Sequence, residues 1–255
     1  QVLDGLVKDG LWDVYKDFHM GNATEICATE YKISREEQDA YAIESYKRSA
    51  KSYELGLFKE EIVSLEIPQR GKDPLVVSED EEFRKVDFNK IAGLKPAFQK
   101  DGTVTAANAS KLNDGASAVV LMSKERADAL GIKPLAEIIS FADAQQAPEW
   151  FTTAPSKALP KALAKAGWQV SDVDLWEVNE AFAVVPMALM KELNVSHDKV
   201  NVNGGACALG HPIGASGARI MVTLIHALKA RGLKKGLATL CIGGGEGTAV
   251  ALEIV

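Results

Sequence analysis

The alternation of apolar strands with helices from about residue 113 onward constrains the fold of this chain most strongly. The predicted strands are short apolar runs, and they lie at 117–122, 135–142, 173–178, 199–203, 237–242 and 248–254. The predicted helices fall between most of them, at 123–131, 156–166, 180–193 and 216–231. This rhythm predicts an α/β fold with a mostly parallel sheet covered by helices, and its last two strands are joined by a Gly-rich turn.

Residues 1–112 have a different character, which is irregular and polar. They hold a charged tract at 71–85 and one long helix with clear end signals. Ser34 and Glu37 have the spacing of a capping box, and Gly56 follows the last helical position. We therefore expect a lobe, built around a binding surface, beside the α/β part.

Composition excludes several classes of function. The net charge of −6 and the pI of about 5.4 argue against a nucleic-acid partner, since such proteins usually carry a basic face. No apolar run approaches the roughly 18–20 residues that a membrane helix needs, so we expect no membrane insertion. Three scattered cysteines do not form a disulfide framework, and a reducing intracellular compartment is expected.

Three loops that each follow a predicted strand carry residue types suited to catalysis. Asn179 begins one loop, His211 lies in the Gly-rich stretch 204–217, and Cys241 precedes the glycines at 243–245. Dense glycines let the backbone approach a ligand, a His can act as a base, and a Cys with a stabilised thiolate can act as a nucleophile or base. Each residue alone is more often structural, but their co-occurrence at neighbouring strand ends predicts an active site.

Seven segments resemble the thiolase family, and they occur in family order along almost the whole chain. They are HMG at 19–21, REEQDAYA at 35–42, FQKDGTVTAANAS at 98–110, NDGASAVVLM at 113–122, NEAF at 179–182, GGACALGHPIGASGAR at 204–219 and CIGGGEG at 241–247. The HMG segment resembles the short-chain, biosynthetic type of thiolase, the acetoacetyl-CoA thiolases or acetyl-CoA acetyltransferases.

The resemblance implies a layered αβαβα fold of two similar halves with an inserted loop lobe. Residues 1–112 would be most of the CoA-binding loop lobe, 113–135 a return segment to the N-terminal half, and 136–255 the C-terminal domain. Thiolases carry their acyl-accepting cysteine in the N-terminal half, which would lie upstream of this chain, and Cys27 lacks the expected surroundings. We therefore expect a C-terminal portion, incomplete at the N-terminus and inactive alone.

The resemblance further implies a reversible Claisen condensation of two acetyl-CoA to acetoacetyl-CoA and CoA, with no covalently bound cofactor. His211 would deprotonate the acyl-accepting thiol and help to hold the thioester oxygen. Asn179 would fix a water that donates to the same oxygen. Cys241 would remove the α-proton of the second acetyl-CoA, which requires a lowered thiol pKa, and the Gly243 N–H would serve a second oxyanion hole.

Other residues match substrate and cation positions of the family. The CoA set comprises His19 and Ser110 at the pantetheine arm, Met20, Phe98 and Phe182 along its tunnel, and Lys85, Asp87 and Lys90 near the nucleotide. One branch of the family binds potassium, and the matching groups are Tyr46 and the carbonyls of Ala106, Ala107, Ala109 and Cys207. Two competing interpretations stay open: Tyr46 also fits the apolar stripe of the long helix, and the charged residues also fit a solvated face.

Three alternatives compete with a short-chain thiolase. β-Ketoacyl synthases share the fold but typically pair two histidines with their cysteine, and Asn179 and Cys241 argue against that class. A longer-chain 3-ketoacyl-CoA thiolase and a non-catalytic CoA-binding protein remain. By resemblance we expect a homodimer or homotetramer in the mitochondrial matrix or cytoplasm, with mitochondria favoured for a eukaryotic protein.

Overall fold

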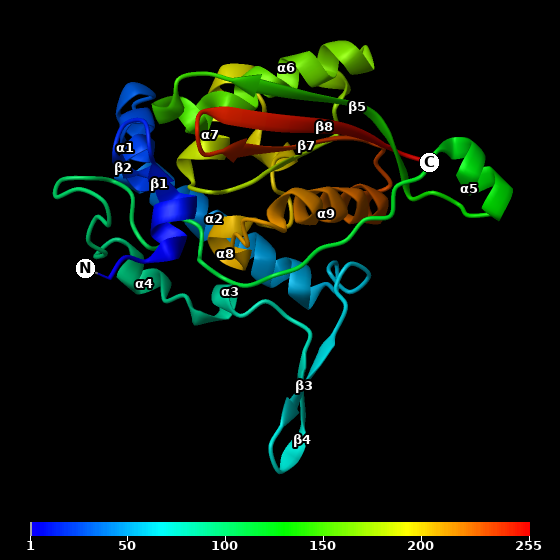
Figure 1. The fold of residues 1–255 in the computed structure, drawn as a ribbon, viewed down its shortest axis with the longest axis horizontal. Coiled ribbons are helices and arrows are strands. Elements are labelled where there is room, and N and C mark those ends of the chain that lie inside the picture. Colours follow the sequence, from blue (N-terminus) through cyan, green and yellow to red (C-terminus); the bar gives the residue numbers. More distant parts are fainter. Residues whose placement is uncertain (1) are drawn as a thin grey trace.

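A four-stranded sheet forms the centre of the computed structural model, which describes residues 2–255 (Figure 1). Its strands, in spatial order, are β5 (Ala136–Gln145), β8 (Glu246–Ile254), β7 (Lys235–Ile242) and β6 (Leu175–Val178). β8 is antiparallel to both neighbours, whereas β6 and β7 are parallel. The predicted mostly parallel sheet is therefore wrong, because the tight turn between β7 and β8 enforces antiparallel pairing.

Helices cover both faces of this sheet. Successive side chains of β8 point to opposite faces of the sheet, so that Ala249 and Ala251 pack in the cluster that contains Leu159 of α6 (Ala154–Ala166). Leu252, on the opposite face of β8, packs with Leu224 of α9 (Ser216–Arg231). Two layers of helix on one twisted sheet bury the apolar residues of both strand faces, as an α/β fold requires.

Two segments before α9 depart from the predicted elements. The helix predicted at 180–193 begins later, as α7 (Val184–Leu193), because the residues after β6 form a loop. The strand predicted at 199–203 is wrong. The 3-10 turn His197–Lys199 occupies its start, Asn201 has a positive φ of 48°, and Val200 makes only an isolated bridge to Trp176.

The long helix of the lobe is confirmed as α2 (Arg35–Glu54). Ser34 Oγ accepts a hydrogen bond from the Glu37 amide, and the Glu37 carboxylate accepts one from the Ser34 amide, which completes the capping box. Gly56 follows the helix with a φ of 68°. Before α2 the chain forms a π-turn (Val7–Leu11), the short paired strands β1 (Trp12–Asp13) and β2 (Phe18–His19), and α1 (Met20–Glu30).

A β-hairpin that no sequence pattern predicted projects from the lobe (Figure 1). Its strands β3 (Leu65–Gln69) and β4 (Lys72–Val77) are antiparallel and exposed along their whole length. Two short helices, α3 (Glu82–Lys85) and α4 (Phe88–Ile91), return the chain toward α1 and α2. The charged tract at 71–85 is therefore partly regular structure, and most of its residues are exposed, whereas Phe83 is buried.

The strand predicted at 117–122 is wrong, because residues 117–122 have no strand partner among the residues described. Val120 is 85% exposed and Leu121 is 67% exposed, so no sheet buries the side chains of this apolar run. The helix after it is confirmed as α5 (Lys124–Leu130), capped by Ser123 and ended by Gly131 in the left-handed region. Within residues 2–255, no helix combines the length and apolar character needed to cross a bilayer.

Candidate active site

His211 lies in the loop between α8 (Ala206–Leu209) and α9, and its imidazole is held in one orientation. Its amide donates to the Lys111 carbonyl at 3.0 Å, and its Nδ1 lies 2.6 Å from Ser216 Oγ. The Ser216 hydroxyl donates its own proton to the Pro212 carbonyl at 3.0 Å. Ser216 must therefore accept from Nδ1–H, which leaves Nε2 unprotonated and able to accept a proton.

Asn179 lies directly opposite that nitrogen. It follows β6, and its amide N–H donates to the Thr239 carbonyl of β7 at 3.0 Å. Its Nδ2 lies 3.3 Å from His211 Nε2, whereas its buried Oδ1 has no hydrogen-bond partner among residues 2–255. The predicted pairing of a carboxamide with an imidazole at the strand ends is thus present in the fold.

The electrostatics of the pocket keep this imidazole neutral. Burial, and then the positive charge of Arg219, lower the pKa of His211 to about 4. Arg219 itself pairs with the buried Glu177 carboxylate at 3.1 Å. At neutral pH His211 is therefore an unprotonated base in a low-dielectric pocket, where hydrogen bonds to developing charge are strong.

Cys241 and Gly243 lie at the end of β7, two and four residues after the Thr239 carbonyl that holds Asn179. In Figure 1, β7 points toward α8 and the start of α9, so these loops meet at one end of the sheet. Cys241 belongs to the same core cluster as Met20 and Phe182, and a Cβ on Gly243 would lie 3.1 Å from Met20 Cε. Burial raises the pKa of the Cys241 thiol to about 12. That direction is opposite to the one a base needs.

The residues matched to the pantetheine tunnel converge on this region. The His19 ring stacks on Phe98 with 4.7 Å between centroids, and Phe98 meets Phe182 edge-on at 6.0 Å. Met20 joins the same cluster, and the Ser110 amide donates to the Ala181 carbonyl at 3.1 Å. Four separate segments of the chain thus build one aromatic surface near Cys241.

The charged CoA candidates lie elsewhere. Lys85 pairs with Glu81 at 2.9 Å and with Glu82 at 2.8 Å, while Lys90 lies 3.3 Å from Asp87. All three candidates are exposed, and their partners are residues of α3, α4 and the turns beside them. No contact in the structure links them to the aromatic surface.

Two of the four carbonyls matched to potassium contact a lysine side chain. Lys111 Nζ donates to the Ala106 carbonyl and, at 3.1 Å, to the Ala109 carbonyl. It also lies 5.5 Å from the centre of the Tyr46 ring, and Tyr46 packs in an apolar cluster with Phe83. The residues do not fit a potassium ion at these two carbonyls, because the ammonium group already binds both of them.

Sequence reasoning missed Ser216, Lys111 and Glu180 as parts of this site. Glu180 is fully buried, and its carboxylate accepts from Tyr41 Oη at 2.9 Å and Ser45 Oγ at 2.7 Å of α2. It also accepts from Asn201 Nδ2 and the Cys207 amide, each at 3.0 Å. The available signal was an acidic residue two positions after a buried strand.

Comparisons with known proteins identify the family of this chain. Residues 1–125 match the family described as thiolase, N-terminal domain, and residues 132–254 match thiolase, C-terminal domain. A probable acetyl-CoA acetyltransferase from Dictyostelium discoideum is 57% identical over 98% of this chain and 61% of its own length. The chain spans about three fifths of the curated relatives it matches.

Solved structures give the same result. The acetyl-CoA acetyltransferase of Bacillus anthracis aligns with a TM-score of 0.96 and 46% identity, over 100% of this chain and 64% of that one. The Acat5 thiolase of Ascaris suum, in complex with coenzyme A, aligns with a TM-score of 0.91 and 41% identity, over 100% and 65% of the two chains. With both thiolase domains matched and the strand-end loops in place, this chain belongs to the thiolase family.

Proposed function

We propose that this chain supplies the CoA-binding lobe and the C-terminal domain of an acetyl-CoA acetyltransferase. The reaction is the reversible condensation of two acetyl-CoA to acetoacetyl-CoA and CoA. The observation that carries the proposal is the Asn179 Nδ2 to His211 Nε2 contact of 3.3 Å, with His211 Nδ1 held by Ser216. The names of the relatives support the same substrates.

His211 acts first, as a base. Its unprotonated Nε2 accepts the proton of the acyl-accepting thiol. The resulting imidazolium, together with a water fixed by Asn179, hydrogen-bonds the thioester oxygen as negative charge develops. The unpartnered Asn179 Oδ1 is free to accept a hydrogen bond from a water or a substrate N–H group. Because Asn179 is buried and His211 is partly buried, each of these bonds is stronger than in water.

Cys241 exchanges a proton with the α-carbon of the second acetyl group. Its raised pKa keeps the thiol protonated, which suits proton donation in the cleavage direction. In the condensation direction its thiolate needs stabilisation that this chain alone does not provide. The Gly243 N–H, at the start of the turn after β7, donates to the oxygen of the acyl group.

The substrate's pantetheine arm lies along His19, Met20, Phe98, Ser110 and Phe182. The nucleotide end of CoA is assigned to Lys85, Asp87 and Lys90, and this assignment is supported by the sequence match alone. No step passes through potassium, since Lys111 already donates to the carbonyls in question. The proposed assembly is a homodimer or homotetramer, in the mitochondrial matrix or the cytoplasm.

The three cysteines of this chain leave the acyl-accepting role unfilled. Cys27 is buried beside Ile33 and Val184, and Cys207 Sγ donates to the Asn108 carbonyl at 3.6 Å. Burial raises the pKa of Cys27 to about 11 and raises that of Cys207 as well, so neither is a ready thiolate. We infer that these 255 residues alone do not catalyse the condensation.

The test is an assay of the complete protein and of residues 1–255 with acetoacetyl-CoA, a longer 3-ketoacyl-CoA and free CoA. We expect the complete protein to cleave acetoacetyl-CoA, and residues 1–255 to bind CoA without turnover. Preferential cleavage of the longer substrate would favour a 3-ketoacyl-CoA thiolase of broader range. Binding without turnover by the complete protein would indicate a non-catalytic relative.

A further inference from the structure

The Lys111 side chain folds back onto its own segment. Its Nζ donates to the carbonyls of Ala106 and Ala109, and it faces the Tyr46 ring at 5.5 Å. The turn closed by the Ala109 amide and the Thr105 carbonyl at 3.0 Å brings these carbonyls together. Carbonyl dipoles that converge in this way repel one another unless a cation or a donor lies between them.

The segment held by Lys111 supports both catalytic loops. The Asn108 carbonyl accepts from the Ala183 amide at 2.8 Å, and the Ser110 amide donates to Ala181 at 3.1 Å. The Lys111 carbonyl accepts from the His211 amide at 3.0 Å. A shift of this segment would therefore move His211 and the loop that begins at Asn179.

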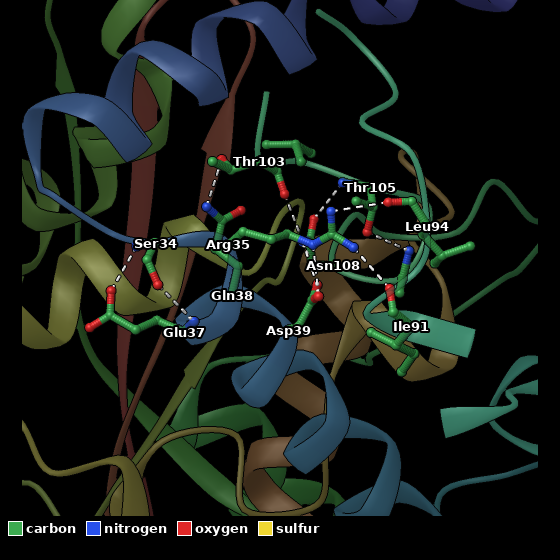
Figure 2. Close-up of polar contacts among 12 residues, drawn as sticks. Ser34, Arg35, Glu37, Gln38, Asp39, Ile91, Leu94, Thr103, Thr105 and Asn108 are labelled. Carbon is green, nitrogen blue, oxygen red and sulfur yellow. Dashed lines mark hydrogen bonds and ion pairs between the residues drawn. The ribbon is translucent and has the colours of Figure 1, made fainter. Parts of the chain in front are cut away.

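The other side of the segment is fixed to α2, as Figure 2 shows. Asn108 Nδ2 donates to Asp39 Oδ1 at 2.9 Å, and Gln38 Nε2 donates to Thr103 Oγ1 at 2.8 Å. Arg35 pairs with Asp39 at 2.7 Å and also donates to the carbonyls of Ile91 and Leu94. None of these bonds to α2 reaches the Ala106 or Ala109 carbonyl, which Lys111 binds instead.

The contacts of the Lys111 ammonium offset the cost of its burial. Burial is the largest influence and lowers the pKa of Lys111, while the carboxylates of Glu82 and Glu180 oppose that shift. The Tyr46 ring offers its electron-rich face to the same group. The ammonium thus contacts two carbonyls and a π face.

We propose that Lys111 is a tethered cation that fills the carbonyl site by itself, so that this chain holds His211 in place without an exchangeable monovalent ion. A lysine side chain of the same chain occupies the site at a fixed effective concentration, whereas occupancy by a free ion depends on the ion concentration of the solution. The protein is therefore indifferent to potassium, and removal of the lysine exposes the site to it.

The experiment compares thermal unfolding of the complete protein in potassium chloride and in tetramethylammonium chloride at equal ionic strength. Wild type and the control Lys100→Ala, an exposed lysine near the same segment, should give the same Tm in both salts. Lys111→Ala should have a lowered Tm in tetramethylammonium chloride and recover about 2–4 °C of it in potassium chloride. Lys111→Met should be lowered in both salts, because its apolar chain still fills the site.

Three results would overturn the proposal. They are a potassium-specific rise of Tm in wild type, an equal Tm of Lys111→Ala in both salts, and a potassium-specific recovery of Lys111→Met. If Lys111→Ala folds only in potassium chloride, the proposal holds; if it folds in neither salt, the proposal fails. Unfolding requires no turnover, so the outcome is independent of the proposed acetyltransferase activity.

Discussion

Replacing Ser216 with Ala tests how the imidazole is held. The substitution removes the acceptor of His211 Nδ1–H at 2.6 Å and the donor to the Pro212 carbonyl at 3.0 Å. A buried N–H left without a partner costs about 1–3 kcal/mol. Without Ser216 Oγ as acceptor, the tautomer with the proton on Nδ1 is no longer favoured over the tautomer with the proton on Nε2. The Nε2-protonated tautomer cannot accept the thiol proton.

If the same 1–3 kcal/mol is lost from the transition state, kcat falls by about 5- to 150-fold, while KM changes little. The assay is thiolysis of acetoacetyl-CoA by the complete protein. Ser140→Ala is a matched control, because it removes a buried hydroxyl bond of 2.7 Å to the Ala162 carbonyl away from this site. Retention of kcat within twofold in Ser216→Ala, or an equal loss in Ser140→Ala, would refute the reasoning.

Three further predictions concern the same loops. The pKa of His211 is about 4 in the folded protein and about 6.5 in the unfolded chain. The contribution of His211 to the free energy of unfolding is therefore fully present above pH 6.5, and it falls by up to about 3 kcal/mol toward pH 4 because the unfolded chain binds the proton more tightly. Urea midpoints of wild type measured between pH 4 and pH 7 should show this loss, and His211→Asn should reduce it. Cys241→Ala in the complete protein should still accept an acetyl group from acetyl-CoA yet fail to condense it, as mass spectrometry and product assays can measure, and loss of acetyl loading would contradict its role. Gly245→Ala should unfold at lower urea, by about 2 kcal/mol or more, because Gly245 has a φ of 92° and an added Cβ would lie 2.3 Å from the Gln146 carbonyl; an unchanged midpoint would contradict this.

Local signals in the sequence predicted the elements that depend on local energy. The capping box fixed the start of α2 at Arg35, and the helix at 216–231 was predicted with its observed ends. The strands at 117–122 and 199–203 were wrong, because an apolar run becomes a strand only if a neighbour supplies hydrogen bonds. Neither run has such a neighbour in the described residues, apart from the isolated bridges of Val200 to Trp176 and of Val202 to Gly204.

The same distinction holds for the site. Asn179, His211 and Cys241 were predicted as one constellation because each was placed after a predicted strand, and Asn179 and His211 do lie together although the strand predicted before His211 is absent. Ser216 and Lys111 were missed, since a serine in a helix's first turn and a lysine in a polar loop have no distinctive pattern. Their importance comes from their hydrogen bonds to His211, which only the three-dimensional arrangement defines.

The buried Glu180 carboxylate has a consequence for how this chain can open. One carboxylate is shared by α2, Asn201 and the backbone at Cys207, so separation of α2 from these loops would leave an anion buried without its partners. Local separation of these elements is therefore costly. Amide protons of α2 and residues 205–209 should exchange with solvent together, at the rate of cooperative unfolding.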